Sequence, residues 1–173
     1  VDWLNANLHG LFKVISQVIE AVLGGVEGAL LAPHPYAMIG GVALLAFFFA
    51  NKKVAVFAAL MLAFCLFSGL WVASMQTIAL VSVAVLISVA IAFPLGVIAA
   101  RVKKVDEAFL PILNIMQTVP PCVYLIPAVM LFSLGRVPAI IATIVYGIPP
   151  MLRLTTLAFK QLPKEFLELG QAI

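Results

Sequence analysis

The sequence predicts an all-α integral membrane protein, and its composition carries that prediction. Of the 173 residues, 65% are hydrophobic and only 10% are charged, whereas a soluble domain is nearer one half apolar and one quarter charged. The mean hydropathy is +1.22. So little charge cannot cover a surface in contact with water, so the long apolar runs are expected to cross a bilayer. The net charge of +3 is small and scattered, which argues against binding to nucleic acid.

The N-terminal region, residues 1–34, differs from the rest of the chain. Residues 2–31 repeat apolar side chains at three- and four-residue spacing and carry polar ones on the remaining face. In a membrane protein this pattern is typical of an amphipathic helix that lies in the interface. A cytosolic packing helix is the competing interpretation. The breaker cluster at 32–37, "APHPYA", ends the segment.

Five apolar runs are predicted to be transmembrane helices. A span needs about 20 residues, so the first run is long enough only if it begins near Pro35. The charged stretch "RVKKVDE" at 101–107 is expected to be a loop, "GRVP" at 135–138 to turn the chain, and Pro149-Pro150 to interrupt the last span. Residues 35–70 would hold the two N-terminal spans and residues 71–173 a core of three. The predicted spans are 35–50, 54–70, 74–100, 108–134 and 139–159.

The basic residues predict the orientation of these spans. Cytoplasmic loops of membrane proteins are enriched in Lys and Arg. With five spans, eight of the ten basic residues fall on one side, and only Lys13 and Arg136 fall on the other. This distribution predicts that residues 160–173 are cytoplasmic and that the N-terminal helix lies on the outer face. The eight are Lys52, Lys53, Arg101, Lys103, Lys104, Arg153, Lys160 and Lys164.

The segment 114–132, "NIMQTVPPCVYLIPAVMLF", is the best candidate for a translocation pathway. Pro120, Pro121 and Pro127 are predicted to break the helix, and a break at membrane depth is tolerated where it is packed in protein or lines a wet cavity. Asn114, Gln117 and Thr118 share one helix face just before it, and Tyr124 follows. The alternative for each polar group is a hydrogen bond to the backbone or to a neighbouring helix.

Several functional classes lack their usual residues in this sequence. No Asp or Glu falls in a predicted span, which disfavours a proton- or sodium-driven carrier. No P-loop pattern occurs, and neither a catalytic constellation nor metal-ligand spacing is found. We therefore predict no catalytic residues, no metal and no cofactor in this chain.

From Trp71 to Ile173 the sequence resembles the permease subunit of binding-protein-dependent ABC importers. Within these it is most similar to the glycine betaine/proline betaine (osmoprotectant) branch. The resemblance is carried by "MQTIAL…FPLGVIAAR", by "PILNIMQTVPPCVYLIPAVMLFSLGRVPAIIATIVYGIPPMLRLT" and by "LPKEFLELGQAI". It implies the type I ABC importer permease fold, incomplete at the C-terminus, in a multi-pass protein of the bacterial plasma membrane.

The resemblance also implies a coupling helix in the EAA-type loop, which docks on the ATPase subunit. Aligned on "LP", Glu168 takes the Glu position of the motif, with Leu169 and Gly170 where two alanines are usual. Independently, Pro163 and Glu165 suit the first turn of a helix. Phe166 and Leu167 then add to an apolar patch that would need a partner.

The function implied is a transmembrane subunit that moves glycine betaine or a related quaternary ammonium osmoprotectant by alternating access. Its implied partners are the bilayer, a second permease copy, two ATPase subunits that hold ATP and Mg, and an external substrate-binding protein, either separate or fused beyond residue 173. The chain would not be an enzyme by itself. Alternatives are an ABC permease for another small solute such as choline or carnitine, a secondary carrier, or a membrane scaffold.

Overall fold

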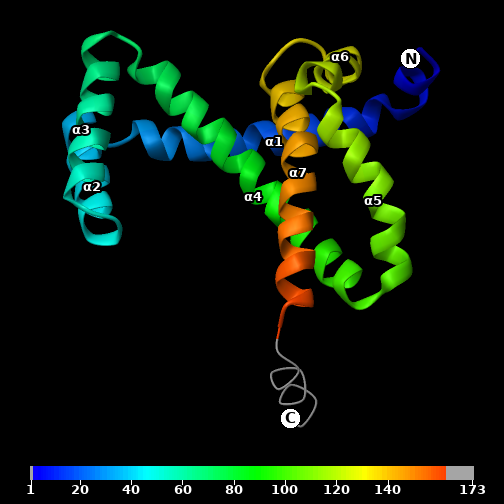
Figure 1. The fold of residues 1–173 in the computed structure, drawn as a ribbon. Helices are drawn as coiled ribbons and strands as arrows, with labels where there is room; N and C mark the ends of the chain where they lie inside the picture. Colours follow the sequence, from blue (N-terminus) through cyan, green and yellow to red (C-terminus); the bar gives the residue numbers. More distant parts are fainter. Residues whose placement is uncertain (1, 163–173) are drawn as a thin grey trace, which may run out of the picture. The chain divides into compact units, whose positions relative to one another are not determined.

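The computed structural model describes the backbone of residues 2–162 and the side chains of residue 10 and residues 12–162. Every regular element in this part of the chain is a helix (Figure 1). The predicted all-α fold class is therefore confirmed. The helices are α1 (Asp2–Leu31), α2 (Pro35–Phe49), α3 (Lys52–Phe67), α4 (Trp71–Arg101), α5 (Lys103–Thr118), α6 (Pro121–Phe132) and α7 (Arg136–Lys160).

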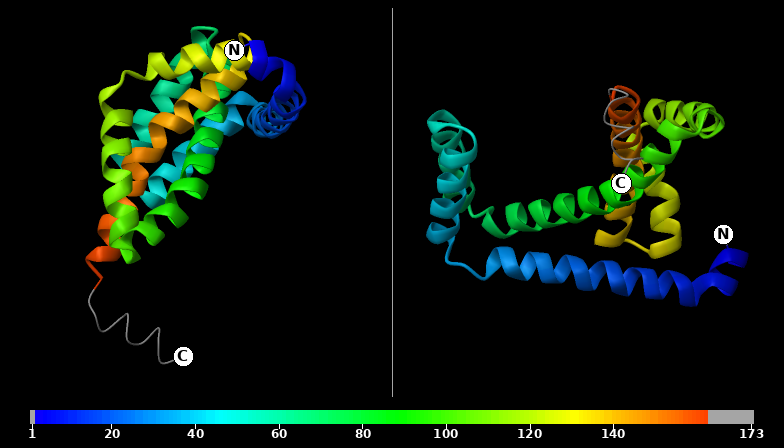
Figure 2. Two further views of the ribbon diagram at one scale, coloured as in Figure 1. Left: turned by 90° about the vertical axis from the view of Figure 1, so that its right-hand side faces the viewer. Right: turned by 90° about the horizontal axis from the view of Figure 1, so that it is seen from below.

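Fewer of these helices than the five predicted have the length of a membrane span. Among the described residues three qualify by length and composition, namely Phe12–Leu31, α4 and α7, and α5 with α6 would make a fourth if the bent pair is one span. α2 and α3 have 15 and 16 residues, which is less than the roughly 20 that a bilayer requires. These two short helices pack against each other as a hairpin (Figure 2).

The helix α1 is more apolar than the sequence pattern suggested. Its stretch Phe12–Leu31 is long and apolar enough to span, so a location in the interface stays a prediction. Glu20 and Glu27 lie in this stretch. Glu27 accepts a hydrogen bond from Gln76 Nε2 at 2.7 Å. If Phe12–Leu31 is a span, the statement that no Asp or Glu lies in a span holds only for the others, namely α4, α6, α7 and the part of α5 after Glu107.

The chain divides into two compact units, residues 14–83 and residues 1–13 with 84–173. The predicted division at residues 34 and 70 stays a prediction, and both boundaries of these units lie elsewhere. Both fall inside long helices, because α1 and α4 each contribute residues to both units. In the unit of residues 14–83 the most deeply buried side chains are Leu23, Met75 and Ala79. In the same unit Asn51 caps the N-terminus of α3, because its Oδ1 accepts a hydrogen bond from Val54 N at 3.0 Å.

In the other unit, α4 and α7 approach each other through small residues. Ala84, Ser88, Ala92 and Gly96 follow at four-residue intervals along one face of α4. A Cβ added to Gly96 would lie 2.7 Å from Thr155 Cβ, so no larger residue fits without movement. Small residues let helix backbones come close in a membrane, where no hydrophobic effect drives helices together.

Polar side chains in this seam bond mainly to backbone carbonyls. Ser88 Oγ donates to Ala84 O at 2.8 Å, and Thr156 Oγ1 to Leu152 O at 2.8 Å. Thr156 Oγ1 also lies 3.2 Å from Gly96 O on α4. These contacts match the interpretation that most uncharged polar groups in the spans bond to the backbone or a neighbouring helix.

The charged stretch 101–107, predicted to be a loop, is mostly helical. Arg101 ends α4, Val102 alone lies between helices, and α5 begins at Lys103. Asp106 lies in the first turn of α5, where the helix dipole favours an acidic residue. Lys103 and Glu107 form an ion pair at 3.6 Å with i,i+4 spacing. Charge alone therefore did not mark a loop.

Candidate translocation site at a broken helix

The segment 114–132 contains a sharp interruption between α5 and α6. α5 ends at Thr118, α6 begins at Pro121, and the two helices are bent by 93° (Figure 1). Val119 and Pro120 between them have ψ values of 126° and 141°. Each precedes a proline, and a residue before proline is pushed out of the helical region. Two successive prolines thus force two successive extended residues, and the chain turns there.

Pro127 does not take part in the break, although we grouped it with Pro120 and Pro121. It lies inside α6, which continues to Phe132. Pro149 and Pro150 likewise lie inside α7, which runs from Arg136 to Lys160. A proline within a helix removes one backbone donor. The consecutive prolines in α7 do not interrupt that helix, so a proline pair alone does not decide where this chain breaks.

Tyr124 stabilises the break through its hydroxyl group. In a continuous helix, Met116 O would accept from the backbone N–H of residue 120, but proline has no N–H. Tyr124 Oη donates to Met116 O at 3.1 Å instead. The first turn of α6 thus supplies the donor that Pro120 removes from the last turn of α5. We had placed Tyr124 with the pathway candidates, and this contact gives it a structural role.

Replacing Tyr124 by Phe should lower the free energy of unfolding by about 0.5–1.5 kcal/mol, the net contribution of one hydrogen bond. The ring is kept and only the donor to Met116 O is lost. Thermal denaturation of the purified protein in detergent measures the effect. Tyr146→Phe on α7 is the matched control, and an equal loss of stability there would contradict the assignment.

The predicted polar face of α5 is only partly tied to other elements. Asn114 Oδ1 accepts from Arg153 Nη2 on α7 at 2.5 Å. Thr118 Oγ1 donates to Ile115 O in its own helix at 3.0 Å. Asn114, Gln117 and Thr118 are all exposed in this chain. They are therefore open to a partner, a lipid or a pathway, and the pathway role stays a prediction.

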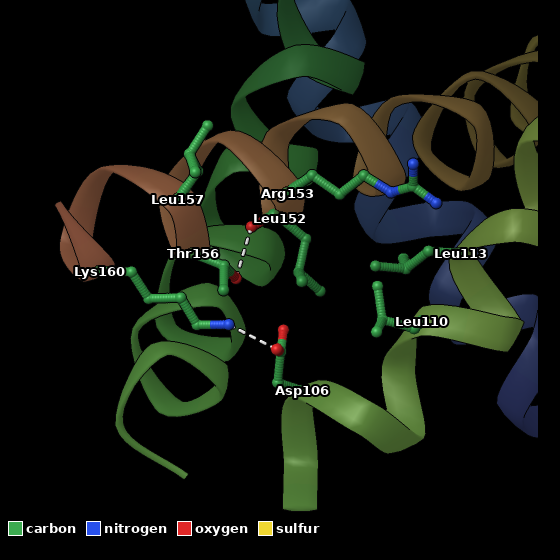
Figure 3. Close-up of a pocket in the computed structure, with 8 residues that line it drawn as sticks. All are labelled: Asp106, Leu110, Leu113, Leu152, Arg153, Thr156, Leu157 and Lys160. Atoms are coloured by element: carbon green, nitrogen blue, oxygen red, sulfur yellow. Dashed lines mark hydrogen bonds and ion pairs between the residues drawn. The ribbon is translucent and has the colours of Figure 1, made fainter. Parts of the chain in front are cut away.

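A cavity of about 280 Å³ lies between α5 and α7 (Figure 3). Its lining residues from α5 are Asp106, Leu110 and Leu113, and those from α7 are Leu152, Arg153, Thr156, Leu157 and Lys160. Lys160 Nζ forms an ion pair with Asp106 Oδ2. Arg153 Nε is buried and has no hydrogen-bond acceptor among the described residues.

Sequence reasoning missed the polar contacts across this cavity. Asp106 was assigned to a loop, and Arg153 and Lys160 were used only as markers of the cytoplasmic side. A signal was present, because Arg153, Thr156, Leu157 and Lys160 follow the three-four spacing of one helix face. The spacing could have shown that the two cations share a face, but it could not identify their partners on α5.

The predicted coupling helix lies outside the described residues. Its members are Pro163, Glu165, Phe166, Leu167, Glu168, Leu169 and Gly170. The last described residues, Gln161 and Leu162, follow directly on α7.

These features define a class: an all-α, multi-pass membrane protein whose broken helix packs against a long continuous one. Residues 92–173, which begin in α4 and include α5 to α7, match the family described as the inner membrane component of binding-protein-dependent transport systems. This segment is therefore similar to members of that family. The predicted resemblance is confirmed.

Individual relatives match nearly all of this chain. It is 32% identical over 172 residues to the glycine betaine transport system permease protein of Bacillus subtilis. That alignment covers 99% of this chain and 61% of the relative. It is 34% identical over 173 residues to the glycine betaine/proline betaine permease of Escherichia coli, with 99% and 49% covered. For the glycine betaine/carnitine permease of Listeria monocytogenes the identity is 33% over 175 residues, with 97% and 61% covered. The chain thus spans one half to three fifths of these relatives' length.

Proposed function

We propose that this chain is the transmembrane subunit of an ATP-driven importer for glycine betaine or a related quaternary ammonium osmoprotectant. The observation that carries the proposal is the similarity of 32–34% over nearly the whole chain to permeases of glycine betaine systems. The match of residues 92–173 to the permease family adds to it. The ATP and Mg would be bound by partner ATPase subunits, so the chain itself would not be an enzyme.

The cargo is best described as a small solute with a fully methylated nitrogen. The relatives are named for glycine betaine, proline betaine, carnitine, choline and trimethylamine N-oxide. A cation of this kind is bound tightly by aromatic faces. In the described part of the chain Tyr36, Trp71, Tyr124 and Tyr146 lie on four different helices. We therefore assign tight selection to the binding protein and a permissive neutral path to this subunit.

The proposed orientation places residues 160–173 in the cytoplasm and the N-terminal helix on the outer face. The ion pair between Lys160 and Asp106 supports part of this, because it holds the end of α7 beside the start of α5. Lys103, Lys104 and Lys160 then share one side, as the distribution of basic residues requires. A second copy of the permease would complete the pathway, and the segment 163–170 would dock on an ATPase subunit.

Changes in the coupling segment test the proposal. Glu168→Lys or Leu169→Arg should abolish betaine uptake coupled to ATP, because a reversed charge or a buried cation in the docking patch costs several kcal/mol. Uptake is measured in vesicles that hold the complete importer. Lys52→Glu, at the first residue of the short helix α3, is the control for a charge reversal elsewhere. Normal uptake by both coupling variants would refute ATP-driven coupling through this segment.

Cysteine accessibility tests the pathway face. In a Cys65→Ala, Cys122→Ala background, cysteines at Gln117 and Thr118 should react with water-soluble thiol reagents in at least one transport state, since residues that line a path contact water. A cysteine at Ile112, which is also exposed but lies on another face of α5, is the comparison. Protection of both test positions in every state, with and without ATP, would remove them from the path.

Competition separates the alternative cargoes. Unlabelled choline, carnitine and trimethylamine N-oxide are added in excess to vesicles that take up labelled glycine betaine. We expect carnitine to compete and an unmethylated amino acid such as glycine not to compete. Uptake that glycine blocks as well as carnitine would contradict recognition of a methylated nitrogen.

A further inference from the structure

Two polar contacts join α5 to α7 on either side of a layer of leucines. Figure 3 shows the first of them, between Asp106 and Lys160. Near the start of α5, Lys160 pairs with Asp106. Near its end, Arg153 donates to Asn114 at 2.5 Å. We call these two contacts the rungs. Between them lies the cavity of about 280 Å³, lined by Leu110, Leu113, Leu152 and Leu157.

The rungs connect two places that matter for the proposed importer. Lys160 is the last residue of α7 and lies three positions before Pro163, where the predicted coupling segment begins. Asn114 lies one turn before Thr118, the residue at which α5 ends and the break begins. The N-terminal half of α7 also contacts α6, the helix that follows the break.

We propose that the rungs hold α5 and α7 together as one moving body, so that a displacement of the cytoplasmic end of α7 reaches the break between α5 and α6. This inference rests on the proposed function, because a coupling segment has a role only in an ATP-driven importer. Asp106, Asn114, Arg153 and Lys160 are positioning residues in this scheme. They act through the break; Asp106, Arg153 and Lys160 are assigned no contact with the cargo, and Asn114 in addition stays a predicted pathway residue.

Apolar packing joins α5 to α7 mainly through Leu113 and Leu152, which are 4% and 3% exposed and belong to one buried cluster. Apolar contacts of this kind are not directional, and Leu110 and Leu157, which also line the cavity, are exposed. Directional polar contacts at both ends resist sliding and rotation of one helix on the other. Energetic coupling through a protein travels along packed side chains and such polar networks.

The first rung is shielded from solvent better than an ordinary surface ion pair. The Asp106 and Lys160 side chains are 22% and 43% exposed. The pair of Lys103 and Glu107, on the same turns of α5, is 89% and 60% exposed and joins two residues of α5 itself. Surface pairs contribute little because water and salt screen them. Lys103–Glu107 therefore provides a matched control for the loss of one ion pair in this region.

The first experiment measures betaine uptake per ATP hydrolysed, in vesicles that hold the complete importer. Asp106→Asn and Asn114→Leu should each lower this ratio about tenfold, which is a typical coupling factor. Betaine-stimulated ATP hydrolysis should persist, because the ATPase subunits are untouched. Glu107→Gln should leave the ratio unchanged. The exchanged pair Asp106→Lys with Lys160→Asp should restore most of the ratio, since it rebuilds the contact with reversed charges.

The second experiment measures the movement directly. In a Cys65→Ala, Cys122→Ala background, spin labels at Lys104→Cys and Gln161→Cys report the distance between the start of α5 and the end of α7. That distance should stay the same with and without trapped ATP, and it should broaden in Asn114→Leu. A distance that changes with ATP in the otherwise unaltered protein would overturn the single moving body.

These outcomes separate the rungs from the proposed function itself. If the unaltered protein shows no ATP-dependent uptake, the proposed function fails before any variant is compared. If it transports and the rung variants keep its uptake per ATP, the rungs carry no coupling and only this inference fails. If the rung variants are poorly folded, the exchanged pair decides, because restored folding without restored coupling also refutes it.

Discussion

Replacing Gly96 by Leu should prevent stable folding of the helices that carry the site. A Cβ at this position would lie 2.7 Å from Thr155 Cβ, 2.9 Å from Thr155 Cγ2 and 3.1 Å from Leu152 O. Overpacking costs typically about 1–3 kcal/mol and occasionally more, and Leu adds four carbons where the first does not fit. Moving α4 away would also lengthen the contact between Thr156 Oγ1 and Gly96 O, now 3.2 Å.

The size of the effect is measured by the yield of monodisperse protein and by its thermal denaturation in detergent. Gly96→Ala should lose less, since the higher helix propensity of Ala offsets about 1 kcal/mol. Adding Thr155→Gly to Gly96→Ala should recover stability, because it removes the two closest atoms. Gly40→Leu in α2, where nothing lies within 4 Å of the added Cβ, is the control. Equal yields for the Gly96 and Gly40 variants would contradict the close approach of α4 and α7.

Replacing both Pro120 and Pro121 by Ala should reduce betaine uptake by at least about tenfold, a free-energy change of 1.4 kcal/mol. Each proline costs about 3 kcal/mol in the interior of a helix, so their removal lifts the main local barrier to one continuous helix. Met116 O would then find its usual donor at residue 120, and Tyr124 would lose its role at the break. Packing of α6 on α7 opposes the change.

The bend is measured with spin labels at Ile112 and Ile126, exposed positions on α5 and α6. The axes of the two helices now meet at a bend of 93°. If the helices joined into one straight helix, the distance between the labels would increase. Pro111→Ala and Pro127→Ala are matched controls, because these prolines lie inside helices that continue past them. Unchanged uptake in the double variant would show that the break is not needed for transport.

The positions of the helices were predictable because they depend on local patterns. Apolar runs and breaker clusters placed α1, α2, α4 and α7 within a few residues of their observed bounds. The start of α5 was missed because Lys103–Glu107 carries helix-compatible charge, with an i,i+4 pair and an acid in the first turn. The number of spans was overestimated because the runs 35–50 and 54–70 were counted as spans, although α2 and α3, with 15 and 16 residues, are shorter than the roughly 20 that a bilayer requires.

The site was predictable only in part, because its polar contacts join residues far apart in the sequence. Pro120 and Pro121 marked the break, and Asn114 was identified as a polar residue on the helix before it. Its partner Arg153 lies 39 positions away, and a helical pattern in one segment does not show which face of another helix it meets. The structural role of Tyr124 was missed for the same reason, because its hydroxyl reaches Met116 O only when α5 and α6 are bent.

The most direct test of the proposed function is accumulation of labelled glycine betaine in vesicles that hold the complete protein with its ATPase subunits and binding protein. ATP should drive uptake against a gradient, uptake should stop when either ATP or the binding protein is left out, and a protonophore should have no effect. Uptake that proceeds without ATP and collapses when the proton or sodium gradient is dissipated would identify a secondary carrier and contradict the account.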